Sequence, residues 1–173
     1  MTPWTLPTTV VQYAEPGAED YDISWDSDTD FREIKIADQT YIRTVKDLLH
    51  ISRSPKLDVT MKTWYLRCTG FNFLNTPDAI SGIQLRLIGN RRGRITDDTI
   101  QLCLQEQGVG KNQANFDLSP AKIYGNKTDL WETQLTNVDI QDPTFGVLIR
   151  LQSHPHWPHK DSAFLSSVEL RIY

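Results

Sequence analysis

The amino-acid sequence predicts an all-β protein, an antiparallel, jelly-roll-like β-sandwich with an extended N-terminal arm. Several short segments alternate apolar and polar residues, which is the period of a half-buried strand. Glycine and proline turns separate these segments, and no long segment has the helical period. The irregular stretch between Leu104 and Leu130 suits a Greek-key or jelly-roll crossing better than a simple meander.

The size and charge of the chain restrict its functional class. The sequence has 173 residues, which suits one domain, and a formal net charge of −4. Proteins whose main function is to bind nucleic acid are usually strongly basic, so no direct nucleic-acid contact is expected. No apolar run approaches the ~20 residues that span a bilayer, and the N-terminus lacks the pattern of a signal peptide. We therefore expect that the protein is synthesised in a cytoplasm and does not associate with a membrane.

The first 30 residues differ in composition from the rest of the chain. We predict an extended arm at 1–30 and the β-sandwich domain at 31–173. The arm combines three prolines and an acidic run with four large aromatic residues: Trp4, Tyr13, Tyr21 and Trp25. A solvated tail has little reason to keep such residues, each of which buries about 150 Å² or more when docked. The arm is expected to pack against its own domain or a neighbouring subunit, with a flexible tail as the alternative.

Alternation places the strands of the domain. Strands are expected at 64–68 with a continuation toward 71–73, and then at 83–88, 99–104, 130–135, 145–151 and 168–173. The segments 83–88 and 99–104 resemble a long hairpin with its tip at 89–94. Thr136 is a plausible N-cap for a single helical turn over 137–140, which Pro143 ends.

Residues 31–60 carry a weaker pattern. Short strands are expected at 31–36 and 41–45. The segment 45–51 suits either one or two helical turns or a strand.

Two cysteines, Cys68 and Cys103, each lie inside an expected strand. We expect two buried thiols that act as small hydrophobic side chains. A bridge between neighbouring strands is the alternative, although a reducing compartment disfavours it.

The paired carboxylates Asp97 and Asp98 are the first candidate for chemistry. We expect them in a turn, where aspartate side chains accept hydrogen bonds from backbone groups. A general acid and base would have to face one pocket, whereas adjacent residues tend to point apart. The sequence also lacks phosphate-loop, nucleophile-elbow, zinc-protease and dinucleotide motifs. No catalytic residue and no cofactor are therefore expected.

Trp131 is expected to cap the sandwich core, with its ring N–H bonded to a loop carbonyl group. Asp129 is expected to hold the loop that positions it. The alternative is an exposed platform for stacking sugars, as in a carbohydrate-binding module that recognises a host surface, formed by Trp131, Trp157 and Tyr124.

Three histidines within six positions form the second candidate for chemistry. His154, His156 and His159 could ligate Zn²⁺ or Ni²⁺. The more ordinary interpretation is a proline-stiffened surface loop that displays Trp157 to a neighbouring subunit. We therefore expect no metal site and keep the histidines as the alternative.

Five motifs occur in order over the C-terminal half of the chain. They are Ile80-Ser81-Gly82-Ile83, Ile95-Thr96-Asp97-Asp98, Tyr124-Gly125 through Asp129-Leu130-Trp131, Val138-Asp139-Ile140 through Phe145-Gly146-Val147, and the closing strand Val168–Tyr173. Their order resembles a β-sandwich domain of tailed-bacteriophage virion structural proteins. Asn126 and Glu132 stand where glycine is common in that family, and residues 153–161 resemble an insertion.

The resemblance implies a non-enzymatic virion structural protein, assembled in the host cytoplasm and located in the virion. The preferred function is capsid decoration or cementing, and the alternative is a tail, neck or fibre-base component. Its partners would be the major capsid protein or tail and neck proteins, and a homo-oligomer such as a trimer is plausible. The expected partner-binding anchors are Trp4, Tyr13, Tyr21 and Trp25 in the arm and Trp157 in the loop, because aromatic residues commonly dominate interface energetics.

Overall fold

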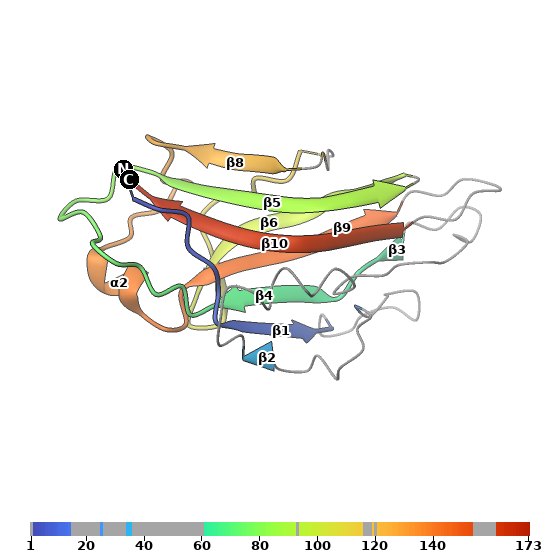
Figure 1. Cartoon of the computed structure of the whole chain (residues 1–173), viewed down its shortest axis with the longest axis horizontal. Helices are drawn as coiled ribbons and strands as arrows, with labels where there is room; N and C mark the ends of the chain where they lie inside the picture. The colour runs from blue at the N-terminus through green and yellow to red at the C-terminus, as the bar shows by residue number, and fades with distance from the viewer. Residues whose placement is uncertain are drawn as a thin grey trace.

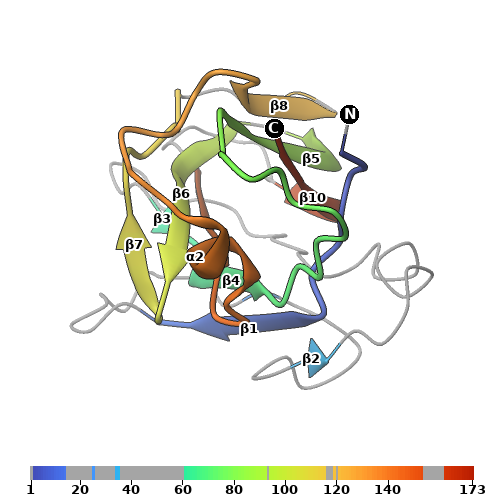
Figure 2. The same cartoon turned by 90° about the vertical axis from the view of Figure 1, so that its left-hand side faces the viewer.

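The protein is a β-sandwich in which two antiparallel sheets pack face to face (Figures 1 and 2). The computed structural model describes residues 2–14, 25, 34–35, 61–92, 94–115, 119, 121–153 and 162–173. The predicted all-β sandwich is therefore confirmed. The expected strand at 41–45 and the expected helical turn at 45–51 lie outside the described residues.

The larger sheet has the strand order β2-β1-β4-β9-β6-β7 in the described part of the chain, and β3 also pairs with β9. Its strands are β1 (Thr9–Tyr13), β2 (Ile34–Lys35), β3 (Met61–Lys62), β4 (Tyr65–Thr69), β6 (Ile95–Leu104), β7 (Gln107–Val109) and β9 (Gly146–Ser153). The second sheet has the order β10-β5-β8 and comprises β5 (Ile83–Arg92), β8 (Lys122–Asn126) and β10 (Ser162–Ile172).

The expected hairpin between 83–88 and 99–104 is wrong. These segments are parts of β5 and β6, and they belong to opposite sheets. β5 pairs with β10 and β8, whereas β6 pairs with β9 and β7. Both strands bury one face in the same core, so both show the same alternation. Alternation identifies the buried face of a strand but not its hydrogen-bonded partner.

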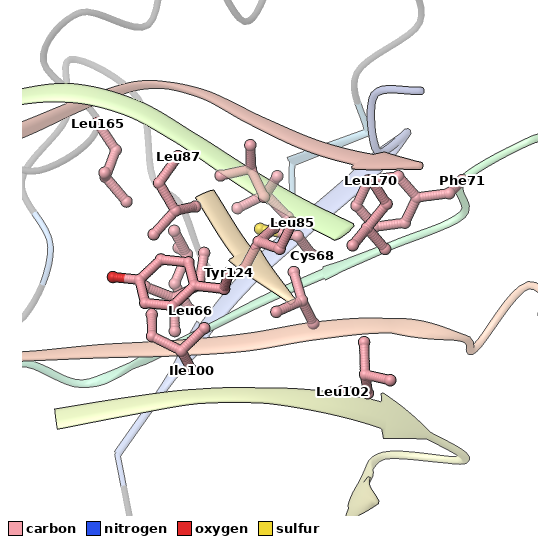
Figure 3. Close-up of a cluster of buried hydrophobic side chains, with 14 of the residues drawn as sticks. Leu66, Cys68, Phe71, Leu85, Leu87, Ile100, Leu102, Tyr124, Leu165 and Leu170 are labelled. Carbon is pink, nitrogen blue, oxygen red and sulfur yellow. The ribbon is translucent and has the colours of Figure 1, made fainter. Parts of the chain in front are cut away.

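The core lies between the two sheets. Leu85 and Leu87 of β5 face Leu66 of β4 and Ile100 of β6, and all four side chains are almost fully buried (Figure 3). Each buried aliphatic side chain of this size contributes roughly 1.5–3 kcal/mol relative to exposure. These residues are the apolar members of the alternating segments, so the pattern in the sequence predicts the core-facing side of each strand.

Asp97 and Asp98 were expected in a turn. That expectation is wrong, because both residues lie inside β6. The pairing of β6 with β9 is irregular between Asp97 and Thr99, where a β-bulge occurs. The Asn112 side chain stabilises this bulge, because its Oδ1 accepts from Ile100 N at 2.8 Å and its Nδ2 donates to Asp98 O at 3.0 Å. Polar residues here therefore mark a bulged strand and not its end.

The loops differ from expectation at three places. Residues 71–73 are not a strand, because β4 ends at Thr69 and Gly70 follows with a φ of +71°. Residues 130–135 are not a strand either, because Trp131 and Glu132 have φ values of +57° and +55°. Left-handed backbone is incompatible with an extended strand. The expected irregular crossing instead contains β8.

The N-terminal segment joins the two sheets. Thr5 pairs with Leu170 of β10, with N–O distances of 2.8 and 2.9 Å, and Thr2 Oγ1 donates to Ile172 O. Residues 9–13 then form β1 along β4 in the larger sheet. Figures 1 and 2 show this dark blue segment running from β10 to the opposite sheet. Residues 2–13, which we call the N-terminal strap, are therefore hydrogen-bonded to both sheets of the sandwich.

The helix α2 (Asn137–Gln141) confirms the predicted single turn and its cap. Thr136 is the N-cap, and its hydroxyl accepts from Asp139 N while the Asp139 carboxylate accepts from Thr136 N at 2.7 Å. This reciprocal arrangement is a capping box. In the part of the chain that the structure describes, no helix has the length and apolarity to cross a bilayer.

Replacing Thr136 by alanine is expected to lower the free energy of unfolding by about 1 kcal/mol. Hydrogen bonds from Thr136 lower the pKa of Asp139. The stabilisation that depends on this carboxylate is complete above its unfolded-state pKa and is lost as the pH falls through its folded-state pKa. Urea unfolding should therefore show a wild-type advantage that narrows in acid. Thr136→Ser, which keeps the cap, should resemble wild type, and an advantage that does not depend on pH would contradict the assignment.

Candidate partner-binding surface

One face of the sandwich presents large polar and aromatic side chains to solvent. It is the outer face of the sheet β10-β5-β8. Leu85, Leu87 and Leu170 point into the core, so their strand neighbours point outward. We call this surface the Trp4 face. Its residues are Trp4, Gln84, Arg86, Ile123, Glu169, Arg171 and Tyr173.

The outer face of the larger sheet is different. Its central side chains include Leu148 and Arg150 of β9 and Cys103 of β6, whose strand neighbours point into the core. These three outward side chains are nevertheless at most 6% exposed. Arg150 donates to Thr63 O at 3.1 Å and lies 4.8 Å from the Tyr65 ring centroid. Its charge is therefore already satisfied inside the chain. These three side chains are therefore not available to a partner, whereas Ile123 of the Trp4 face is 48% exposed.

Trp4 is held over this face by two arginines. The guanidinium carbons of Arg86 and Arg171 lie 4.4 and 4.3 Å from the centroid of the Trp4 ring. Contacts of this kind contribute about 0.5–1 kcal/mol at exposed sites. The backbone pairing of Thr5 with Leu170 places Trp4 directly beside β10. The strap therefore delivers a large aromatic ring to the surface in a fixed position.

The two arginines differ in their charge partners. Arg86 Nε donates to Glu169 Oε2 at 2.8 Å, and Arg86 Nη2 contacts the same oxygen. Arg171 donates from Nη1 to Tyr173 Oη at 3.3 Å, and its buried Nε has no hydrogen-bond partner in the structure. No ion pair joins Arg171 to a carboxylate among the described residues.

The other expected anchors occupy different places. Tyr13 stacks on Tyr65 with ring centroids 5.4 Å apart, on the outer face of the larger sheet, and burial raises its pKa. Trp25 is only 2% exposed and donates from Nε1 to Trp64 O at 2.7 Å. Its ring is therefore part of the hydrophobic core and not an exposed anchor. Tyr21 and Trp157 lie outside the described residues.

Trp131 and Tyr124 do not form a sugar-stacking platform. Trp131 is fully buried, and its Nε1 donates to Ile83 O at 2.9 Å. Asp129 Oδ1 accepts from Trp131 N at 2.7 Å, so the predicted positions of Trp131 in the core and of Asp129 beside it are confirmed. The acceptor of the ring N–H is a carbonyl group of strand β5, whereas the sequence predicted a loop carbonyl. Tyr124 is 3% exposed and donates to the buried Asp97 carboxylate at 2.9 Å. Neither ring can stack on a glycan while the sandwich is folded.

The paired carboxylates interact with different surroundings. Asp97 Oδ2 accepts from Tyr124 of the opposite sheet, inside the core. Asp98 Oδ1 lies 3.0 Å from Lys62 Nζ, and its Oδ2 lies 3.8 Å from Arg150 Nε. They therefore do not share one pocket, which is the geometry that a general acid and base would need.

The remaining candidates for chemistry are cysteines and histidines. Cys68 and Cys103 are buried free thiols, as predicted. Burial raises the pKa of both, that of Cys103 to about 12, so neither is a thiolate near neutral pH. His154, His156 and His159 lie outside the described residues. Elsewhere, in the ranges that the structure describes, no group of three or more His, Cys, Asp or Glu side chains is placed to hold a metal ion.

The sequence contained a signal for the Trp4 face that its aromatic pattern alone does not reveal. Arg86 and Arg171 are polar members of the alternating segments 83–88 and 168–173, positions that face solvent in a half-buried strand. What alternation cannot show is that β5 and β10 are neighbours, with Arg86 opposite Glu169 and Arg171 opposite Gln84. The cluster depends on this register.

Comparison of the chain with known protein families, curated proteins and solved structures finds no match.

Proposed function

We propose that this protein is a non-enzymatic structural component of a bacteriophage virion and that it attaches to the capsid through its N-terminal segment as a decoration or cement protein. The observation that supports this best is where the resembling motifs lie. Ile83 N donates to Asp129 O at 2.9 Å, and Ser81 N donates to Tyr173 O at 2.7 Å. Three motifs distant in sequence therefore meet at one end of the sandwich.

These motifs have framework roles. Trp131 closes the core, and a Cβ atom on Gly82 would lie 2.3 Å from the backbone carbon of Lys127. Residues used in this way maintain a fold and do not supply chemistry. Function would then depend on surfaces, and the Trp4 face has the residue types that dominate protein interfaces, namely Trp, Tyr and Arg.

Attachment would bury this face against a coat subunit. Trp4 supplies apolar area, and Arg171 supplies a guanidinium group for which the described residues provide no carboxylate. A partner surface with an acidic side chain opposite Arg171 would match it. A specific interface of standard size buries about 1,600 Å² in total, so neighbouring residues must also contribute.

Protein composition of purified particles tests the assignment. The phage that encodes this chain would be purified on density gradients, and the copy number measured by quantitative mass spectrometry against the coat protein. A copy number comparable to that of the coat protein would place the chain on the shell, and a far smaller one would place it at the tail or neck. Particles that contain none of it would show that the proposal is wrong.

Substitutions on the Trp4 face test whether this surface attaches the protein to the particle. Trp4→Ala and Arg171→Ala should each weaken attachment to particles grown without this protein by about 30-fold, the effect of losing a hot-spot residue worth about 2 kcal/mol. Binding would be measured by co-sedimentation. Val138→Ser is the matched control, because Val138 is 79% exposed on α2 and lies outside the Trp4 face. Circular dichroism would establish that all variants remain folded, and equal binding by the three variants would exclude this face.

A further inference from the structure

The N-terminal strap pairs with the edge of one strand in each sheet. Its first half pairs with β10 at Thr5, and its second half pairs with β4 from Thr9 opposite Thr69 to Tyr13 opposite Tyr65. Withdrawing the strap together with β2, which pairs with β1, would break no other described strand pair, because β10 also pairs with β5 and β4 also pairs with β9. The rest of the sandwich can therefore keep its pairing while the strap changes partners.

The groove that the strap fills cannot stay empty at low cost. Val10 is 3% exposed, Pro7 is buried, and Leu6 packs against the core. Without these residues, apolar core surface and the edges of β10 and β4 would meet water together. Unpaired edges of this kind attract other strands. Whatever fills the groove must supply the same backbone pairing and the same apolar side chains.

A second copy of the chain supplies this segment without any new complementarity. Its strap has the same sequence, so every contact from Trp4 to Tyr13 can be reproduced between two molecules. A conventional apolar interface has less support on the described surface, where the exposed large hydrophobic side chains are only Leu74, Ile123 and Val138. Exchange of the strap joins copies without a preformed apolar patch.

The chain is long enough for the exchange. Trp25 and β2 would move with β1, because Gln12 Oε1 accepts from Trp25 N at 2.8 Å and β2 pairs with β1. Residues 36–60 then connect this unit to β3. A segment of that length reaches roughly 80 Å when extended. The longest strand, β10, spans only about 36 Å.

We propose that the N-terminal strap, with Trp25 and β2, exchanges between copies, so that the strap of one molecule fills the groove between β10 and β4 of another and builds a symmetric homo-oligomer. The inference rests on the proposed function in one respect, namely that the N-terminal segment serves assembly.

Disulfide trapping tests the exchange with a single substitution. Val10 lies opposite the native Cys68, and both side chains are buried, so Val10→Cys places two thiols in register. The full-length variant would be assembled at high concentration, oxidised and run on a non-reducing gel. Exchange predicts that most of the chain migrates as covalently linked multimers that collapse to monomer on reduction. Val10→Ser, which has no second thiol opposite Cys68, should give no such multimers.

Two measurements keep the test decisive. Sedimentation of the wild-type chain should give whole-number multiples of the monomer mass, and a monomer at every concentration would overturn the proposal. So would an oligomer in which the disulfide between the introduced thiol and Cys68 lies within one chain. If the buried thiols do not oxidise, Val11→Cys with Arg67→Cys provides a second, more accessible pair in the same register.

The outcomes are separable from those of the proposed function. A monomeric chain found in purified particles would remove strand exchange and leave the virion role. An exchanged oligomer that is absent from particles would show that the virion role is wrong and would leave strand exchange in place.

Discussion

Replacing Trp131 by alanine is expected to lower the free energy of unfolding by about 3–5 kcal/mol. Trp131 is the largest fully buried side chain in the described structure. Its loss would leave a cavity next to Ile83 and would remove the hydrogen bond from Nε1 to Ile83 O. Because single domains have total stabilities of roughly 5–15 kcal/mol, this change would unfold a large fraction of the protein under mild denaturant.

Trp131→Phe separates the two contributions. Phenylalanine retains much of the ring volume but cannot donate to Ile83 O, so its cost should be about 1–3 kcal/mol, the range for a buried acceptor left unsatisfied. Urea unfolding followed by circular dichroism would rank wild type above Trp131→Phe and Trp131→Phe above Trp131→Ala. Val138→Ala, at an exposed site on α2, is the control and should change little. A Trp131→Ala protein as stable as this control would contradict the role assigned to the ring.

The buried faces of the strands were predictable because alternation is a local property. Ile83, Leu85 and Leu87 alternate with polar residues, and the structure buries all three. The partner of a strand is not a local property. Nothing in the segments 83–88 and 99–104 indicates that they lie in different sheets, and two core-facing strands with a short connection read as a hairpin.

Backbone conformation was the second limit on prediction. Trp131 and Glu132 adopt left-handed φ values, although neither is a residue that favours them. They hold this conformation because the Trp131 ring is anchored in the core and Asp129 binds its backbone N–H. The sequence indicated the role of Trp131 correctly and its backbone incorrectly, since the role follows from its chemistry and the backbone from tertiary contacts.

The Trp4 face was predictable only in part. Trp4 was expected to be an anchor because a large aromatic residue in a proline-rich segment needs a docking site. Its actual contacts, Arg86 and Arg171, come from strands that are distant in sequence and become neighbours only in the folded sheet. Trp25 carried the same aromatic signal and lies in the core instead. Residue type therefore indicated docking but did not distinguish a core position from a surface one.

Gly146→Ala is expected to destabilise the protein by about 3 kcal/mol or more, at the upper end of the range for overpacked cores. Gly146 begins β9, between Thr69 of β4 and Cys103 of β6. A Cβ atom at this position would lie 1.8 Å from Cys68 O and 2.8 Å from Cys68 C. These are backbone atoms of a paired strand, so they cannot move aside without breaking the pairing of β4 with β9.

Gly108→Ala is the matched control, because it introduces the same methyl group on β7 of the same sheet. There the nearest atoms belong to the flexible end of the Gln101 side chain, with Oε1 at 2.6 Å, and no backbone atom is in the way. This variant should differ from wild type by no more than about 0.5 kcal/mol. Urea unfolding would compare the two, and amide exchange of β4 would locate the damage. If Gly146→Ala is insoluble while Gly108→Ala folds, the steric argument holds. Equal stability of the two variants would show that β4 can yield, and that the glycine of the Phe145-Gly146 motif is not required for close strand approach.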